Sequence, residues 1–406
     1  MEEKKVPALR FRGFDNAWEQ HKLSELADIV GGGTPSTAIS EYWDGDIDWY
    51  APAEIADQIF VNLSQKKITT EGLNNSSAKI LPVGTVLFTS RAGIGKTAIL
   101  TKEGCTNQGF QSIIPHKDEL DSYFVFSRTD ELKRYGETVG AGSTFVEVSG
   151  KQMANMTISI PATMGEQRQI GTYFRNLDNL IILHQRKLEM LKKVKKSMLE
   201  KMFPKNDAKV PEVRFSDFTD AWEQCKLSDI YQNIGNAFVG TATPYYVENG
   251  HFYLESNNIK EGFINHNTEI FINDEFYEKQ KDKWLHTGDI VMVQSGHVGH
   301  TAVIPEELNN TAAHALIMFR NPKEKIEPYF LNCQYQTFKS KKKIDNITVG
   351  NTIKHILASD MQEFVVDFTS YEEQSKIAVY FKSLDNLIIL HQCKHFSIVI
   401  LNTIIL

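Results

Sequence analysis

The sequence carries the same framework twice, and this repeat constrains the fold more than any other feature. Lys5-Val6-Pro7 and Ala17-Trp18-Glu19-Gln20 recur as Lys209-Val210-Pro211 and Ala221-Trp222-Glu223-Gln224, and residues 177–185 recur unchanged as residues 384–392. The segments between them, residues 30–160 and 234–368, have diverged. A period of about 200 residues indicates a duplicated domain and not a solenoid. The framework is therefore predicted to hold two different inserts.

Length and composition predict packed globular domains. A chain of 406 residues with 41% hydrophobic and 23% charged residues suits two to four domains. The N-terminus lacks the apolar stretch of a secretory signal, and no apolar run reaches the roughly 18 residues of a membrane span. We therefore expect a cytoplasmic protein without a membrane partner. The four cysteines are far apart and form no C-x-x-C pair, so we expect reduced thiols and no metal site.

The charge distribution leaves two interpretations open. A net charge of -7 counts against non-specific binding of a polyanion. However, residues 186–205 hold eight Lys or Arg against two Glu, and a second basic cluster covers residues 339–343. Either cluster could equally be the solvated face of a helix.

A long helix is predicted after each insert. Apolar residues recur at steps of three and four, which is the 3.5-residue period of a coiled coil. The first seam comprises Ile170, Phe174, Leu177, Ile181, His184, Leu188, Leu191, Val194, Met198 and Met202, and the second comprises Ile377, Phe381, Leu384, Ile388, His391, His395, Ile398, Leu401 and Ile405. The first helix would be on the order of 55 Å long, too long for a small domain, which indicates a spacer. The two apolar stripes are expected to pack together antiparallel, with the inserts at opposite ends.

The inserts are predicted to consist of short strands with a few helices. Ser24 and Ser228 are good N-cap residues, so helices are expected from them through Val30 and Tyr231. A turn glycine and a strand-like apolar run occur in each insert, at residues 84–89 and 288–293. Two loops rich in glycine and hydrogen-bonding side chains follow these runs, at residues 91–97 and 295–301.

One of these loops resembles the end of a nucleotide-binding P-loop. Gly93-Ile94-Gly95-Lys96-Thr97 has the required tail, but Ser90 stands where the motif needs its first glycine. His300 replaces the lysine in the other copy. We favour the alternative that the glycines let the backbone approach a phosphate chain or groove, with Arg91 and Lys96 supplying contacts.

No other motif predicts a reaction centre. The sequence has no G-x-S-x-G elbow, no H-E-x-x-H and no amino-methylation motif, so no catalytic or cofactor-binding residue is assigned. His184 and His391 lie on the seams, where they are expected to set helix register and not to bind metal. The pattern indicates a subunit that recognises a target while a partner carries the chemistry.

The doubled framework also resembles a known family. Glu166-Gln167-x-x-Ile170-x-x-Tyr173-Phe174-x-x-Leu177-Asp178 recurs as Glu373-Gln374-x-x-Ile377-x-x-Tyr380-Phe381-x-x-Leu384-Asp385. The shorter phrases are Gly45-Asp46-Ile47-Asp48-Trp49, Leu81-Pro82-Val83-Gly84-Thr85-Val86-Leu87, Asn107-Gln108-Gly109, Gly142-Ser143-Thr144 and Gly350-Asn351-Thr352. With these features the chain resembles, along nearly its whole length, the DNA specificity subunit of type I restriction-modification systems.

The resemblance implies a function without catalysis. Each insert would be a target recognition domain that reads one half of a split sequence in double-stranded DNA. The helices would act as a ruler and bind two methyltransferase subunits, and restriction or translocase subunits would complete the complex. S-adenosylmethionine, Mg²⁺ and ATP would be bound only by those partners.

The expected fold is α+β, with two target recognition domains separated by two long helices packed as an antiparallel coiled coil with pseudo-twofold symmetry. The predicted ranges are 1–162 and 204–369 for the domains, the latter with a linker at 204–214, and 163–203 and 370–406 for the helical regions. After about residue 393 the pattern changes, because Val399 and Ile400 stand where the first copy has Lys192 and Lys193.

Candidate DNA contacts are the polar and glycine positions of the insert loops, because base edges are read by side-chain donors and acceptors. In the first insert they are Ser90, Arg91, Gly93, Gly95, Lys96, Asn107, Gln108, Gln111, Ser143 and Thr144. In the second they are Gln294, Ser295, His297, His300, Asn310, His314, Asn351 and Thr352. Since the two sets differ, the two half-sites are expected to differ.

A function from another class stays open. Two globular domains joined by a coiled coil would also suit an adaptor that binds protein or glycan without DNA specificity. A sequence-specific shift of DNA mobility distinguishes the two, since an adaptor gives none.

Overall fold

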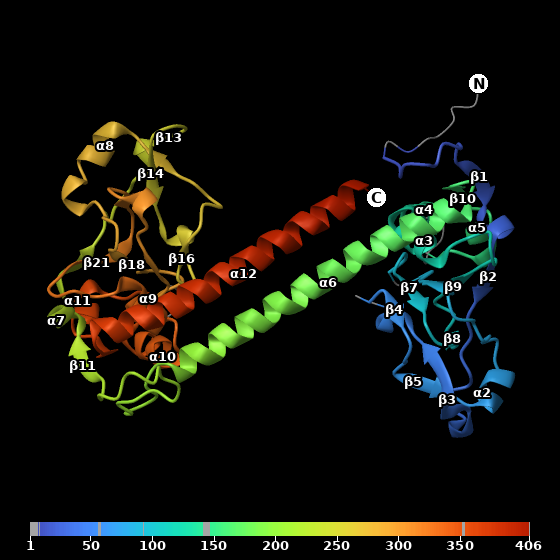
Figure 1. The fold of residues 1–406 in the computed structure, drawn as a ribbon, viewed down its shortest axis with the longest axis horizontal. Helices are drawn as coiled ribbons and strands as arrows, with labels where there is room; N and C mark the ends of the chain where they lie inside the picture. Colours follow the sequence, from blue (N-terminus) through green and yellow to red (C-terminus); the bar gives the residue numbers. More distant parts are fainter. Residues whose placement is uncertain are drawn as a thin grey trace. The chain divides into compact units, whose positions relative to one another are not determined.

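The computed structural model describes residue 7 and residues 9–55, 58–91, 93–140, 147–350 and 354–405, with side chains through residue 400. It divides into two compact units, which we describe separately. The first unit comprises Met1–His184 with Lys394–Leu406, and the second comprises Gln185–Cys393. Both contain strands and helices (Figure 1), as the α+β prediction requires.

The first unit is built on a five-stranded sheet in the order β2-β9-β6-β7-β4, beside a three-stranded sheet β5-β3-β8 and a pair β1-β10. Its strands are β1 (Glu19–Lys22), β2 (Ala27–Gly31), β3 (Trp43–Tyr50), β4 (Phe60–Val61), β5 (Lys66–Ile68), β6 (Val86–Phe88), β7 (Thr97–Leu100), β8 (Cys105–Thr106), β9 (Gln111–Pro115) and β10 (Thr157–Ile160). Its helices are α1 (Leu23–Leu26), α2 (Thr70–Asn74), α3 (Ser122–Ser127), α4 (Thr129–Gly140), α5 (Gly150–Ala154) and the start of α6 (Met164–Lys201). Buried side chains from the large sheet, α3 and α6 share one core.

The second unit has four-stranded sheets in the orders β12-β21-β18-β19 and β13-β17-β14-β20, with pairs β15-β16 and β11-β22. Its strands are β11 (Glu223–Lys226), β12 (Tyr231–Asn236), β13 (Tyr246–Val247), β14 (His251–Leu254), β15 (Ile259–Lys260), β16 (Phe263–Ile264), β17 (Phe271–Ile272), β18 (Ile290–Val293), β19 (Thr301–Val303), β20 (Ala312–Ala313), β21 (Leu316–Pro322) and β22 (Val365–Phe368). Its helices are α7 (Leu227–Ile230), α8 (Asp274–Glu278), α9 (Pro328–Tyr335), α10 (Phe338–Ile347), α11 (Ala358–Gln362) and most of α12 (Tyr371–Ile405).

The two units repeat one topology although their insert sequences have diverged. The order β12-β21-β18-β19 reproduces β2-β9-β6-β7, and a parallel pair, β3-β8 or β14-β20, follows the same plan in both. Short 3-10 turns at Ser40–Tyr42, Pro52–Glu54, Thr243–Tyr245, Ser256–Asn258, Lys281–Lys283 and Glu306–Leu308 connect these elements. The preserved strand order places equivalent loops at equivalent positions.

The repeated framework residues form the same buried ion pair in both units. Arg10 donates from Nε to Glu166 Oε1 at 2.7 Å, and Trp18 Nε1 donates to the same oxygen at 3.3 Å. In the second unit Arg214 and Trp222 bind Glu373 at 2.7 and 3.1 Å. Because a buried carboxylate needs charge-assisted partners, these three residue types are kept together where each long helix begins.

Both predicted long helices are present, as α6 and α12, coloured green and red in Figure 1. Within the second unit they run antiparallel, since Leu188 packs with Leu384 and Ile388 while Phe203 packs with Phe381 further back along α12. The predicted seam residues are buried or half-buried: Ile170, Phe174, Leu177, Ile181, His184, Leu188, Leu191, Ile377, Phe381, Leu384, Ile388 and His391. Whether partner subunits contact them stays a prediction.

One seam position was predicted wrongly. Val194 is 40% exposed, and the neighbouring Lys195 occupies the seam instead. Lys195 forms an ion pair with Asp385 across the two helices, and its side chain is only 12% exposed.

The helices expected from Ser24 and Ser228 are also shorter than predicted. α1 and α7 have four residues each, and the serines are their second residues, since Lys22 and Lys226 precede the helices. The chain then enters β2 or β12, where Ile29 pairs with Ile113 of β9. Pairing in the sheet overrides the local helix signal, as is common for β-branched residues.

All four cysteines are free, as predicted. The described helices include none long and apolar enough to cross a bilayer.

Candidate nucleic-acid interface

In the first unit, the predicted contact loop is the turn of a β-hairpin. β6 and β7 pair antiparallel through Leu87 and Ala98, and Thr89 closes the turn. The Thr89 hydroxyl donates to the Gly93 carbonyl at 2.7 Å and accepts from the Lys96 N–H at 2.9 Å. Backbone bonds from Gly95 to Thr89 and from Thr89 to Lys96 complete the turn. These bonds join the two sides of the turn, and the Lys96 side chain is exposed.

Both glycines of this turn have left-handed backbone angles that disfavour a side chain. The φ angle is +108° at Gly93 and +94° at Gly95. A Cβ on Gly95 would lie 2.3 Å from Cγ of Lys133, whereas one on Gly93 would meet nothing closer than 3.9 Å. Strand β7 follows Lys96, where a P-loop requires a helix. The nucleotide-binding interpretation is therefore rejected.

In the second unit, the equivalent hairpin joins β18 and β19. Met292 pairs with Thr301, and the Val293 N–H donates to the His300 carbonyl at 2.8 Å. Gly296 and Gly299 take the left-handed angles here, with φ of +80° and +86°. The same turn thus carries a different set of side chains in the two units.

His300 is held in one tautomer at the end of this turn. Its Nδ1 accepts the backbone N–H of Glu261 at 3.2 Å, so the ring proton is on Nε2. Burial lowers the pKa of His300, and the charge of His297 lowers it further. At neutral pH the ring is therefore an uncharged hydrogen-bond donor, which suits reading a base acceptor better than neutralising a phosphate.

Other predicted contacts of the first insert lie at the same edge of the sheet. The Ser90 N–H donates to the Gly109 carbonyl at 2.8 Å, and Arg91 forms a backbone bridge with Glu147. Gln108 is exposed, and Gln111 begins β9 opposite Gly31. The loops containing Arg91, Asn107 and Gln111 are therefore neighbours in space.

Not every candidate side chain is available to a ligand. Ser90 and Gln294 are buried, and the Asn107 side chain accepts the Gly109 N–H at 2.8 Å. Gln294 contacts the His355 ring nitrogen at 3.2 Å. Ser90 and Gln294 are therefore less accessible to a ligand than the exposed candidates, and their assignment as DNA contacts stays a prediction.

Two candidates of the second insert, Asn310 and His314, lie on either side of β20. Asn310 precedes β20, is exposed, and accepts the Tyr277 hydroxyl at its carbonyl at 2.7 Å. His314 follows the same strand, with Nδ1 3.4 Å from Glu255 and Nε2 3.0 Å from the Gly240 carbonyl. The hydrogen bond with Glu255 raises the pKa of His314, and burial opposes this shift.

The two remaining described candidates, Ser295 and His297, lie in the turn between β18 and β19. Ser295 is half-buried, with a backbone bridge to His355, while His297 is exposed. Ser143, Thr144, Asn351 and Thr352 lie outside the described residues. As contacts to DNA, all the exposed candidates stay predictions.

Two residues of this surface were not predicted. The Thr34 hydroxyl donates to Oε1 of Gln108 at 2.5 Å and fixes that side chain. His355 pairs with Val349 and Ser295 and so joins the hairpin to the segment after α10. Thr34 follows the three glycines 31–33, and that turn was the only sequence signal for its place near the contact loops.

Comparison with known proteins identifies the class. The family model described as type I restriction modification DNA specificity domain matches residues 16–193 and again 219–396. The chain therefore belongs to this family, and the family's specificity subunits are not catalysts.

Individual relatives agree. The type I restriction enzyme MjaIX specificity subunit of Methanocaldococcus jannaschii is 28% identical over 358 residues, covering 85% of this chain and 81% of the relative. The MjaVIII specificity subunit of the same organism is 23% identical, covering 91% and 87%.

Solved structures share the fold of two repeated domains. A crystal structure of the type I restriction-modification S subunit from M. genitalium aligns with a TM-score of 0.61 at 14% identity, covering 99% of this chain and 98% of that one. A structure from a study of complex assembly and conformational transition of the type I R-M system aligns with a TM-score of 0.51 at 15% identity, covering 97% and 98%. The predicted fold class is thereby confirmed.

Proposed function

We propose that this chain reads a bipartite target in double-stranded DNA, one half with each insert, for a type I restriction-modification complex. The observation that carries the proposal is the duplicated hairpin. β6-β7 and β18-β19 occupy the same place in the same strand order, yet one turn presents Arg91 and Lys96 and the other His297 and His300. A repeated platform with different polar side chains suits two recognition surfaces for different base sequences.

The chain would direct partners that carry the chemistry. Two methyltransferase subunits would bind the helical regions and supply S-adenosylmethionine, and restriction or translocase subunits would add ATP hydrolysis with Mg²⁺. A net charge of -7 fits this division, because partners that surround the duplex can supply further phosphate contacts. The solved relative from the complex-assembly study is in line with partner subunits.

The two turns should contribute to specificity in different ways. Arg91 and Lys96 are cationic and can bind guanine edges or phosphates, whereas neutral His300 offers one N–H donor. We therefore expect the half-site read by the first unit to contribute more to the salt dependence of binding. Each substitution that removes a phosphate-binding cation should reduce the slope of log K against log salt concentration by about one.

The test is methylome sequencing of a host that expresses the chain with its methyltransferase partner. The expected result is a single methylated motif with two specific parts and a non-specific spacer. Replacing residues 30–160 with those of a relative should change one part only. The double variant Arg91→Ala with Lys96→Ala should relax the base specificity in one part of the motif. The double variant His297→Ala with His300→Ala should relax it in the other part.

Lys117→Ala is the control, because Lys117 is an exposed cation of the first unit outside the loops that contain the candidates. If both pairs relax the same half-site, or if the partner methylates without sequence preference, the proposal is wrong. A complex that shows no sequence-specific DNA shift would favour the adaptor function instead.

A further inference from the structure

In the second unit, a short β-hairpin contacts the turn that carries His300. Its strands β15 and β16 pair antiparallel through Lys260 and Phe263, which leaves a two-residue turn of Glu261 and Gly262. These two residues have φ angles of +52° and +93°, and a type I′ hairpin turn requires positive angles at both positions. A left-handed angle is unfavourable for a residue with a side chain, so contacts around Glu261 have to hold it in this conformation.

The hairpin turn determines which nitrogen of the His300 ring carries the proton. The Glu261 N–H donates to Nδ1 at 3.2 Å, and a nitrogen that accepts a hydrogen bond has no proton of its own. Burial lowers the pKa of His300, and the charges of His297 and Lys341 lower it further, whereas the Glu261 carboxylate opposes them. The neutral ring therefore has its N–H at Nε2 for as long as the Glu261 N–H stays in place.

One buried amide joins the hairpin turn to the residue next to His300. The Asn332 side chain donates from Nδ2 to the Gly262 carbonyl at 3.0 Å, and its Oδ1 accepts the Thr301 hydroxyl at 2.8 Å. Asn332 is only 3% exposed, so water cannot easily replace either bond. Gly262 also forms a parallel bridge with Ala302. The position of the hairpin turn relative to His300 therefore depends on Asn332.

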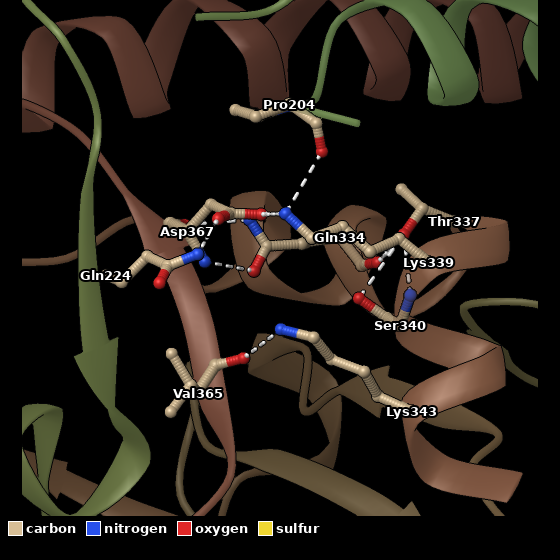
Figure 2. A network of polar contacts seen from close by, with 9 residues as sticks. All are labelled: Pro204, Gln224, Gln334, Thr337, Lys339, Ser340, Lys343, Val365 and Asp367. Atoms are coloured by element: carbon tan, nitrogen blue, oxygen red, sulfur yellow. Dashed lines mark hydrogen bonds and ion pairs between the residues drawn. The ribbon is translucent and has the colours of Figure 1, made fainter. Parts of the chain in front are cut away.

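Helix α9, which carries Asn332, is bonded to strand β22 through a second buried amide. Figure 2 shows Gln334 donating from Nε2 to the Asp367 carbonyl at 2.7 Å and accepting the Asp367 N–H at Oε1 at 3.1 Å. At the start of the next helix, α10, the Thr337 hydroxyl accepts the Ser340 N–H at 3.2 Å. These bonds limit the movement of α9 and of the Asn332 amide.

Helix α10 lies against the same recognition turn. A Cβ on Gly299 would lie 3.0 Å from Cγ2 of Ile344, so the turn and the helix are in close contact. Lys339 and Lys343 bond to β22 at 2.6 and 3.1 Å, as Figure 2 shows. Two lysines of the basic cluster at residues 339–343 therefore hold α10 in place, which is a structural role that the sequence left open.

The first unit has other residue types at the corresponding positions. The counterpart of Thr301 is Thr97, whose hydroxyl lies 2.6 Å from the hydroxyl of Thr129. The counterpart of Asn332 is Phe126, since each is the fifth residue after the N-cap of its helix. The amide bridge thus accompanies the turn that carries histidine. A lysine, as in the first turn, has no tautomer that needs to be fixed.

We propose that Asn332 is a positioning residue for base recognition by the second unit: it holds the Glu261–Gly262 turn against His300 and so keeps the ring as an Nε2–H donor. This inference rests on the proposed function and names the atom that the second half-site has to offer. A fixed N–H donor in the major groove pairs with N7 of a purine, O6 of guanine or O4 of thymine. The His300 ring is half-buried, so part of it is open to a ligand.

The first test determines the tautomer of His300 without DNA. Ring-nitrogen NMR spectra of the full-length chain with ¹⁵N-labelled histidine are recorded at about pH 8, where an ordinary histidine is neutral. His300→Gln identifies the His300 signals among those of the 12 histidines. The wild type should show one tautomer, with the proton on Nε2. Asn332→Ala should give a mixture of both tautomers, because the Glu261 N–H is no longer held against Nδ1.

A matched control separates positioning from a general loss of stability. Gln280→Ala removes another amide that is 3% exposed in the same unit, but this amide bonds Tyr253 and Phe276. Both Gln280→Ala and Asn332→Ala should lower the melting temperature, because each leaves buried polar groups without a partner. Only Asn332→Ala should change the tautomer of His300.

A second variant moves the hairpin turn and leaves Asn332 unchanged. In Gly262→Ala the new Cβ would lie 2.4 Å from Nε2 of Gln336 and 3.2 Å from Nδ2 of Asn332, so the turn has to shift. This variant should also give both tautomers of His300. Gly288→Ala is its control, because Gly288 has a similar φ of +89° and its new Cβ would meet nothing closer than 3.8 Å.

The second test measures base specificity in the methylating complex. Methylome sequencing should show that Asn332→Ala reduces the preference for the correct base at one position of the second half-site by about two- to tenfold, which corresponds to one hydrogen bond. His300→Ala should relax the same position. Because Asn332 acts through His300, the double variant should lose no more preference than His300→Ala alone.

DNA probes with base analogues identify the acceptor atom at that position. Each probe lacks one major-groove acceptor, either a purine N7, the guanine O6 or the thymine O4. One probe should bind the wild-type complex more weakly, by the same factor as His300→Ala loses. The complex with His300→Ala should bind that probe and the natural DNA equally well.

Four results would overturn the inference: a wild-type His300 ring protonated on Nδ1, an unchanged tautomer in Asn332→Ala, additive losses in the double variant, or equal binding of all the probes by the wild-type complex. A wild-type complex that methylates no bipartite motif would reject the proposed function, and base selection by His300 with it. The NMR comparison would then still decide whether Asn332 positions His300.

Discussion

Lys195 of α6 and Asp385 of α12 form a 2.7 Å ion pair in the helix seam of the second unit, where their side chains are only 12% and 14% exposed. Burial raises the pKa of Asp385, and Lys195 opposes that shift. Lys195 Nζ also lies 5.1 Å from the centre of the Phe263 ring, so the pair joins both helices to the insert. Asp178, identical in the repeat, instead accepts the Tyr123 hydroxyl at 2.7 Å.

Removing Lys195 should lower the stability of the protein, because it leaves the buried carboxylate of Asp385 without its cation. Lys195→Met is expected to lower the free energy of unfolding by about 3 kcal/mol at pH 7, and Lys195→Met with Asp385→Leu should recover most of that loss. Urea denaturation of the single and double variants measures the coupling. Lys192→Met, at an exposed position of the same helix, should change stability by less than about 0.5 kcal/mol.

The loss should also depend on pH in a defined direction. The pKa of Asp385 is raised in the folded state, so the folded state favours the protonated carboxyl. The contribution of this group to folding stability is therefore present at low pH and lost as pH rises. Lys195→Met should therefore cost less at pH 4 than at pH 7. An equal loss of stability at pH 4 and pH 7 would show that the charge of Asp385 does not cause the loss.

The two glycines of the β6-β7 turn should differ in their tolerance of alanine. Gly93→Ala is expected to cost about 1–2 kcal/mol from backbone strain alone. Gly95→Ala should cost more, about 3 kcal/mol, because the new Cβ also lies 3.0 Å from the Lys133 Cα, which cannot move freely. Chemical denaturation of both variants measures the difference. Equal losses of unfolding free energy would show that α4 moves easily to make room for the new Cβ.

His314 and Glu255 should stabilise the second unit over a limited pH range. The mutual hydrogen bond raises the pKa of His314 from 6.5 and lowers that of Glu255 from 4.5. The histidine contribution is complete below its unfolded pKa and lost as pH rises through the folded value. The glutamate contribution is present above its unfolded pKa and lost as pH falls through the folded value.

The stability difference between the wild type and His314→Gln should therefore be largest near pH 5–6 and smaller at pH 9. Urea denaturation across this range measures it. His266→Gln is the control, since His266 also pairs with a glutamate, at 2.8 Å, but on an exposed surface. A difference that does not change with pH would mean that the ring acts only through packing.

The ruler role that the family resemblance implies for the helices leads to a prediction about DNA. Inserting one heptad after Gln185 in α6 and another after Gln392 in α12 preserves the seam and adds about 10 Å of helix. The methylated motif should keep both half-sites while its spacer grows by about three base pairs, at 3.4 Å each. An unchanged spacer would show that the helices do not set the distance, and an insertion in α6 alone should destabilise the protein.

Local patterns predicted the parts of the fold that depend on residues close in sequence. The three-four spacing from Ile170 to Leu191 predicted α6, and the glycines at 93 and 95 lie in a predicted loop, where both have left-handed backbone angles. By contrast, Ser24 suggested a helix through Val30, and the chain formed β2 because β9, about 80 residues away, pairs with it. Burial of Ser90 could not be predicted either, because Gly109 and Val148, which bond its backbone, come from distant segments.

The sequence by itself determined the duplication, the two helical seams and the family, because these depend on order and spacing along the chain. Only the tertiary structure decided that Lys195 and not Val194 enters the seam, and that Phe203 packs against Trp222, Phe330 and Phe381. The physical reason is that burial depends on which surfaces meet. Identical residues such as Asp178 and Asp385 therefore acquire different partners.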